Sequence, residues 1–359
     1  MRITSLMIYN QLAGSLQRSM DEFARLNEQL ATGKKIGKPS DDVTGAINSM
    51  GYRLSISSNE QYKRNIDQTN IQLDFTSKIV SSVSDSLLDL HELASMGNNA
   101  QAQEQRDFYS SEAAQWRDYF LSLSNSKLGS KYVFSGQNTD KPAFVYNTTT
   151  GKYDYQGNTG ETKVLIDDQA TATMNIQGSR VFSFALTDPL PTALSDGTPV
   201  QYTQAADPVT GINTVTVTIG NAGDAGYDTF SFSNLMDIAN VMSSSWQYKG
   251  IDGNSLNADA AVSEQMAMHR IAALAKPLDD ARIQALNIES EIGSRQVLVN
   301  DQSTRLDSST LSFQNSLTKT EDADMNQIAT DLIKTQTALQ AMMQSASRIL
   351  SQSLLDFLK

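Results

Sequence analysis

The sequence contains no cysteine and only two histidines, His91 and His269. The absence of cysteine excludes disulfides, zinc sites built on thiolates and cysteine nucleophiles. The string HELAS at His91 does not fit the HExxH zinc pattern, because its fifth residue is Ser95. A lone histidine on a helix is more often a surface or capping group than a metal ligand. The sequence therefore predicts no metal site.

Motifs of the common enzyme classes are also missing. The chain has no GxxxxGK[ST] loop, no GxGxxG turn and no GxSxG elbow. Adjacent acidic residues point apart on a helix or strand, so they are interpreted as caps and solvated faces rather than as an acid and base pair. We predict no catalytic residues, no cofactor and no enzymatic activity. The acidic pairs are Asp41 and Asp42, Asp167 and Asp168, and Asp279 and Asp280.

Positive charge and long apolar runs are scarce as well. With 28 Lys and Arg against 40 Asp and Glu, the net charge of -12 argues against nucleic acid as a partner. The one basic cluster, KKIGK at Lys34 to Lys38, is short and lies beside two aspartates. No apolar run approaches the ~20 residues of a membrane span, and the first residues lack the apolar stretch of a secretory signal. We expect no membrane insertion, and any export to proceed without a cleaved signal peptide.

The length of 359 residues predicts two or three domains. Apolar residues recur at steps of three and four near both ends, whereas period-two runs such as FVYN, KYDY and TVTVTI fill the middle, separated by turn clusters. This order predicts an elongated α+β protein in which an antiparallel β sandwich or barrel is inserted between helical halves. The expected domains are a terminal coiled coil (1–38 and 322–359), a long-helix bundle (39–130 and 235–321) and the β domain (131–234).

Both terminal helices carry apolar stripes that one partner helix cannot cover. In the last segment one seam runs from Met325 to Ile349 at alternating steps of three and four, as in a coiled coil. A second seam, including Ile333 and Met343, lies beside it. Because a soluble monomer rarely exposes so long an apolar strip, we expect other subunits to cover it. The predicted polymerisation interface is Leu6, Leu12, Leu16, Met20, Phe23, Leu26, Leu30, Ile328, Leu332, Leu339, Met342, Ile349, Leu354 and Phe357.

An ordinary buried helix pair in a monomeric bundle is the alternative, and for a single stripe it would be the better interpretation. Two features favour polymerisation. Both ends carry a stripe, and the breaks KKIGKP and KTEDAD separate both terminal helices from their neighbours at equivalent places.

The string LATGKKIGKPSDDVTGA, from Leu30 to Ala46, resembles the N-terminal signature of the bacterial flagellin family. In that signature a helix ends in a basic turn containing glycine, followed by Pro-Ser-Asp-Asp. Within the family, MRIT, GSKYVFSGQNTDKPAF and MNIQGSRVF resemble the hook–filament junction proteins. The resemblance covers residues 1–185 and 277–359, although Val43 stands where Pro or Ala is usual and residues 186–257 match no pattern. The signature-turn residues are Gly33, Pro39, Ser40, Asp41 and Asp42.

The resemblance implies a structural protein of the flagellum, located outside the cell where the hook meets the filament. It implies terminal helices that are disordered in the free monomer, pass unfolded through the export apparatus and fold on joining the axial tube. It also implies four partners: identical subunits, the first hook-associated protein, flagellin, and an export chaperone on the C-terminal helix.

Two other functions remain open. Filament flagellin is the close alternative, against which MRIT and KYVFSG count. A secreted glycan-binding or adhesive protein is the alternative from another class. In that case the serine, threonine and asparagine residues of the β domain would bind sugar, and the terminal helices would serve for oligomerisation only.

Overall fold

The computed structural model describes residues 2–97, 102–207 and 212–357. The chain divides into two compact units: unit 1 comprises Met1–Gln61 and Thr304–Lys359, and unit 2 comprises Tyr62–Ser303. Helices at both ends of the chain and strands in its middle confirm the predicted α+β class. The division into three domains proposed from the sequence stays a prediction.

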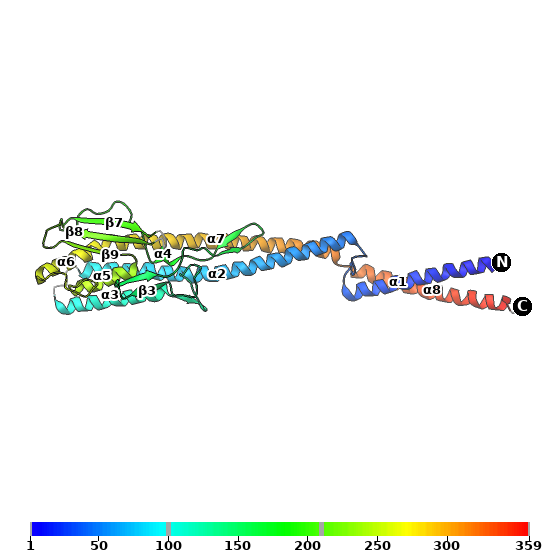
Figure 1. Ribbon diagram of the computed structural model, residues 1–359. Helices are drawn as coiled ribbons and strands as arrows, with labels where there is room; N and C mark the ends of the chain where they lie inside the picture. Colours follow the sequence, from blue (N-terminus) through cyan, green and yellow to red (C-terminus); the bar gives the residue numbers. More distant parts are fainter. Residues whose placement is uncertain (1, 98–101, 208–211, 358–359) are drawn as a thin grey trace. The chain divides into compact units, whose positions relative to one another are not determined.

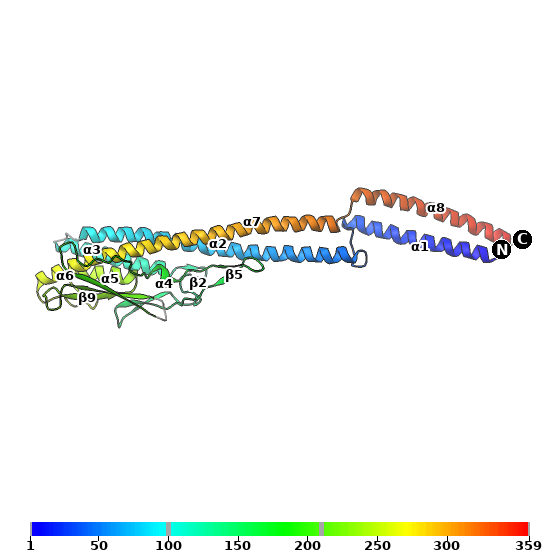
Figure 2. The same cartoon turned by 90° about the horizontal axis from the view of Figure 1, so that it is seen from above.

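Unit 1 is helical. Helix α1 (Arg2–Thr32) and helix α8 (Met325–Phe357) lie side by side and run in opposite directions, as Figures 1 and 2 both show. The two chain ends therefore pack against each other within one chain. The first part of α2 (Val43–Gly97) and the last part of α7 (Ala275–Glu321) complete the unit. They are joined by the rings of Tyr52 and Phe313, 6.2 Å apart, and by Asn59, whose Nδ2 donates to Thr310 Oγ1 at 3.1 Å.

In unit 2 the strands gather on one side of the long helices α2 and α7 (Figure 2). Helix α3 (Gln103–Ser124) packs along α5 (Leu235–Trp246), which is buried over most of its length because its sequence is apolar on nearly every side. Asn234 caps α5 by accepting the Asp237 N–H at 2.9 Å. The short α4 (Gly178–Val181) and α6 (Ala260–Ala273) complete the helices described in this unit.

The inserted strands form neither the sandwich nor the barrel predicted from the sequence. They make three separate antiparallel hairpins, β1–β2, β3–β4 and β5–β6, and one three-stranded sheet, β7–β8–β9. Six of these strands have only two to four residues, too few to build two facing sheets, so the hairpins stay separate. The strands are β1 (Lys127–Leu128), β2 (Lys131–Tyr132), β3 (Phe144–Asn147), β4 (Lys152–Tyr155), β5 (Lys163–Leu165), β6 (Thr171–Thr173), β7 (Val200–Ala206), β8 (Asn213–Ile219) and β9 (Asp228–Phe232).

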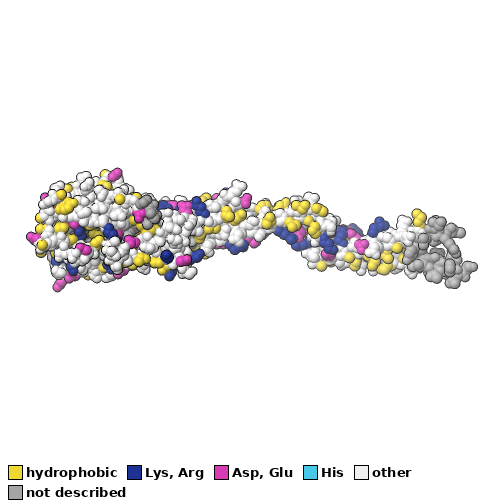
Figure 3. Space-filling view, in the orientation of Figure 1, with side chains coloured by type: hydrophobic (Ala, Val, Ile, Leu, Met, Phe, Trp, Pro, Cys, Tyr) yellow, Lys and Arg dark blue, Asp and Glu magenta, His cyan; other side chains and the backbone are white. Residues whose placement is uncertain are grey.

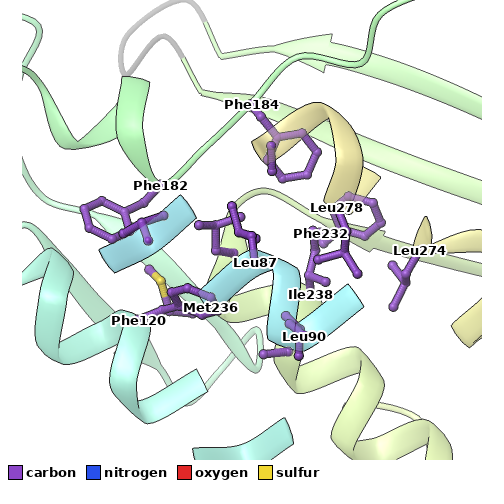
Figure 4. Packing of buried hydrophobic residues seen from close by; sticks show 14 of the residues in the cluster. Leu87, Leu90, Phe120, Phe182, Phe184, Phe232, Met236, Ile238, Leu274 and Leu278 are labelled. Carbon is purple, nitrogen blue, oxygen red and sulfur yellow. The ribbon is translucent and has the colours of Figure 1, made fainter. Parts of the chain in front are cut away.

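One hydrophobic core joins the β3–β4 hairpin and the three-stranded sheet to the helices of unit 2. The Phe182 ring meets those of Phe134 and Phe144 nearly edge on, with centroids 5.2 and 5.8 Å apart. Figure 4 shows side chains from α2, α3, α5 and α7 converging with those of the strands. The core therefore holds the β insertion to the helix bundle. Its members labelled there are Leu87, Leu90, Phe120, Phe182, Phe184, Phe232, Met236, Ile238, Leu274 and Leu278.

A buried carboxylate, Asp237, makes the stability of unit 2 depend on pH. Its two oxygens accept the backbone N–H groups of Tyr153 at 2.9 Å and Ser233 at 3.0 Å. Burial raises the pKa of Asp237 to about 6, and these two hydrogen bonds oppose the rise without cancelling it. The folded pKa therefore lies above the unfolded value of about 3.9, so the folded state holds the proton more tightly.

We expect the contribution of Asp237 to stability to be greatest below pH 4 and to fall as the pH rises from 4 to 6. The loss should be on the order of 2–3 kcal/mol and should not grow further above pH 7. Urea unfolding of the parent and of Asp237→Asn across pH 4–7 isolates this contribution, because the other titrating groups are common to both. A stability difference that stays constant over that range would contradict the assignment.

Candidate functional site

The signature turn closes α1 and joins it to the segment between α7 and α8. Gly33 adopts a left-handed φ of +69°, which favours glycine, and its N–H donates to Gln29 O at 2.8 Å. Lys35 N–H donates to Glu321 O at 2.6 Å, and Ala323 N–H donates to Gly33 O at 3.0 Å. The two places at which the sequence separates the terminal helices from their neighbours therefore bind each other.

The carboxylate of Glu321 fixes this junction. It is buried and accepts hydrogen bonds from Lys34 Nζ at 2.6 Å and from Arg53 Nη2, so three segments meet on one acid. Burial by itself would raise the pKa of Glu321, but the hydrogen bonds and charges of Lys34 and Arg53 outweigh it and hold the pKa below its ordinary value. The ion pairs stabilise the folded junction.

Replacing Glu321 by Ala is expected to destabilise unit 1 by about 1–3 kcal/mol, since both cations lose a charged partner but are half exposed and regain water. Because the folded pKa is lowered, the contribution is complete above the unfolded pKa of about 4.3 and is lost as the pH falls through the folded value. The protection of the Lys35 and Ala323 amides from hydrogen exchange, compared between parent and variant, measures the contribution of Glu321 to stability. Equal protection in parent and variant at pH 7 would refute the role.

The two aspartates of the signature have separate tasks. Asp41 Oδ2 accepts the N–H groups of Gly37 at 3.1 Å and Lys38 at 2.8 Å, which folds the turn, while Asp42 Oδ1 accepts Gly45 N–H at 2.9 Å and caps α2. Gly45 leaves room for Ile36, since a Cβ there would lie 2.5 Å from Ile36 Cδ1. Pro39 and Ser40, also in the predicted signature, are exposed at the tip.

Between α1 and α8 lies a half-buried seam. Ile328 and Leu26 are buried, and Ser19 Oγ donates to Met342 Sδ at 4.0 Å across the pair. Seven more residues of the two helices, some of them in the predicted interface, have half-buried side chains. They are Leu12, Leu16, Phe23, Leu332, Thr335, Leu339 and Ala346. The side chains of four predicted residues, Leu6, Ile349, Leu354 and Phe357, lie outside the described residues.

A second face of the same pair remains uncovered. Ile333 is 62% and Met343 52% exposed on α8, and Met20 and Leu30, both in the predicted interface, are exposed on α1. In Figure 3 hydrophobic side chains reach the surface along these helices. We call the exposed α8 residues Met325, Ala329, Ile333 and Met343 the outer seam. Pairing of α1 with α8 covers one apolar face and leaves this one to solvent.

Sequence reasoning missed a further apolar stripe in unit 1, at the start of α2. Val43, Ile47, Met50 and Leu54 recur at steps of four, three and four and are 61–71% exposed. The spacing was visible in the sequence, but periodicity alone does not distinguish a face that packs within the chain from one left uncovered. Here Ala46, Ser49 and Asn59 are the buried positions instead. We call the exposed residues Val43, Ile47, Met50 and Leu54 the α2 stripe.

The structure offers no other kind of site in the residues that it describes. Within residues 2–97, 102–207 and 212–357 no group of three or more histidine or acidic side chains is arranged to hold a metal ion. None of the described helices has the length and apolar character needed to span a bilayer. The two uncovered apolar faces of unit 1 are accordingly the candidate site, and the chemistry open to them is burial against another protein surface.

Part of the chain is similar in sequence to flagellar proteins. Residues 3–139 match the sequence model of the bacterial flagellin N-terminal helical region. Flagellar hook-associated protein 3 of Salmonella typhimurium is 25% identical over 193 residues, which cover 53% of this chain and 60% of that protein. Its counterpart in Escherichia coli K12 is 24% identical over 184 residues, covering 51% and 57%. The chain thus spans about three fifths of the length of the relatives it matches.

Solved structures share the fold. FlgL from Xanthomonas campestris superposes with a TM-score of 0.55 at 14% identity, over 74% of this chain and 99% of that one. The flagellar hook-associated protein HAP-3 from Legionella pneumophila gives 0.56 at 16% identity, over 75% and 97%. At such identities the likeness establishes the architecture alone.

Proposed function

We propose that this chain, whose residues 3–139 match the sequence model of the bacterial flagellin N-terminal helical region, belongs to that family and is a structural subunit of the flagellar axial tube at the junction between hook and filament. The observation that carries the proposal is the uncovered apolar surface of unit 1, made of the outer seam and the α2 stripe. Burial of a side chain such as Ile or Met gains about 1.5–3 kcal/mol. Neighbouring subunits that cover several of these residues would be held together strongly.

The two faces of the terminal helix pair suggest how the tube grows. The seam between α1 and α8 is already covered within one subunit, so contacts between subunits fall to the exposed residues. Contacts between unlike surfaces, repeated around an axis, produce a tube rather than a closed dimer. The fourteen residues predicted from the sequence would pack within the same subunit where they lie in this seam, and against neighbouring subunits where they are exposed, as Met20 and Leu30 are. The α2 stripe is added to the second group.

The relatives' names, which describe hook-associated and junction proteins, support a place between hook and filament, and the partners proposed for this chain are those expected at that place. One end of the ring would contact the first hook-associated protein and the other flagellin, and an export chaperone would hold α8 before secretion through the flagellar apparatus without a cleaved signal peptide. The absence of catalytic motifs in the sequence supports a purely structural role.

A tagged version of the full chain, located along isolated flagella by immunogold labelling, tests the proposal. We expect one label at the boundary between hook and filament. Label along the whole filament would instead favour flagellin, and so would purified protein that polymerises alone into long filaments. A second tagged chain lacking residues 325–359 is the control, and we expect it to leave the boundary unlabelled.

A further inference from the structure

A groove of about 600 Å³ runs between α2 and α3 in unit 2, apart from the proposed assembly surface. Each helix contributes four residues at spacings of i, i+3, i+4 and i+7, so one complete face of each helix lines the groove. The lining residues are Ser82, Asp85, Ser86 and Asp89 from α2, and Glu112, Gln115, Trp116 and Tyr119 from α3.

Two aromatic rings form the α3 wall. Trp116 packs partly against the hydrophobic core, and its ring meets that of Tyr119 edge on, with centroids 5.8 Å apart. Tyr119 is 41% exposed. The core therefore holds Trp116 in place, while Tyr119 presents an accessible aromatic surface to anything that enters the groove. Aromatic faces attract cations through the ring quadrupole.

Three carboxylates accompany these rings. Within the part of the chain that the structure describes, neither Asp85, Asp89 nor Glu112 takes part in a hydrogen bond or an ion pair. Asp85 and Asp89 stand one helical turn apart, an arrangement of like charges that destabilises a helix.

The cation nearest to Trp116 along α3 is engaged elsewhere. Arg117, the residue after Trp116, donates to Asp118 at 2.8 Å. Its charge is therefore paired with a carboxylate that does not line the groove.

We propose that this groove binds an arginine side chain presented by a basic segment of a partner protein. Guanidinium suits both features, because its planar face stacks on aromatic rings and its N–H fork pairs with carboxylates. A neutral sugar would also stack on Trp116 or Tyr119 but would leave three carboxylates uncompensated. The inference does not depend on assembly into the flagellum, since its residues lie outside unit 1.

The probe is the peptide acetyl-Gly-Arg-Gly-Arg-Gly-amide, titrated into the full-length protein at 0.15 M salt. The chain has two tryptophans, and Trp246 is buried, so a change in fluorescence reports on Trp116. We expect saturable binding with a Kd below about 1 mM, and weaker binding of the lysine version of the peptide. The variant D85N/D89N/E112Q should lose affinity about tenfold or more.

The matched control is E60Q/D67N/D301N, which removes the same charges at exposed positions outside the groove. We expect it to bind within about twofold of the parent. Tyr119→Leu, an exposed change, should weaken binding several-fold without altering charge. Thermal unfolding of the groove variant should occur no lower than in the parent, since a repulsion has been removed.

The proposal is overturned if the peptide shows no saturation, if the two charge variants lose affinity equally, or if Tyr119→Leu binds like the parent. Loss of assembly in a variant of the outer seam would leave all three results unchanged, so the two proposals fail independently.

Discussion

Aspartate at both Ile333 and Met343 is expected to prevent this protein from joining the proposed axial tube while leaving each unit folded. Both side chains are exposed in the single chain, so a charge there meets water and costs the monomer little. In an assembled tube the same charges would be buried without a partner. Losing the burial of two such side chains alone removes about 3–6 kcal/mol, or about 10²–10⁴-fold in affinity.

Recovery of the variant with isolated hook–filament preparations, measured by quantitative immunoblotting against the parent, checks this result. Thr337→Asp with Ser345→Asp is the matched control, because it adds the same charges to exposed polar positions on the same helix. Incorporation of the outer-seam variant at the level of this control would contradict the proposed interface.

A change in the covered seam should behave differently. Leu339 and Met342 are half-buried between α1 and α8, so aspartate at both is expected to separate the two helices as well as block assembly. The melting temperature of unit 2 should stay the same, since neither residue belongs to it. Circular dichroism would register the lost helix only in this variant and not in the outer-seam variant.

The second large effect is expected in unit 2, where Asp228→Ala should lower stability by about 3–5 kcal/mol. Asp228 and Arg270 are both buried and paired through two hydrogen bonds, one of them 2.8 Å from Nη2 to Oδ1. The guanidinium also lies 5.2 Å from the centre of the Phe230 ring. Removing the carboxylate leaves a buried cation without a partner, which is far costlier than losing a surface pair.

Urea denaturation at pH 7 measures this loss. Glu161→Ala, which breaks an exposed pair with Lys163, is the control and should change stability by no more than about 1 kcal/mol. Replacing both partners, as Asp228→Leu with Arg270→Met, should restore much of the stability, because no unpaired charge remains. If the single and double variants are equally unstable, packing rather than the ion pair is responsible.

The sequence by itself determined much of the candidate site. Apolar steps of three and four predicted the terminal helices, and the signature turn predicted where α1 ends and α2 begins, because glycine, proline and capping aspartates act through local backbone geometry. The sequence also placed Ile333 and Met343 on a second seam, because helix geometry alone fixes the angle between two residues of one helix. The order of helices, strands and helices similarly predicted the α+β class.

Only the tertiary structure decided which of these faces is covered and how the middle of the chain pairs. Whether the α2 stripe or its opposite face is buried depends on where α7 lies, and the convergence of Lys34 and Arg53 on Glu321 joins residues far apart in the chain. That the short strands pair as separate hairpins, rather than as two facing sheets, was also decided by contacts between distant parts of the chain. Periodicity shows that a helix or strand has an apolar face. Burial of that face requires a partner surface, and the partner surface comes from distant parts of the chain.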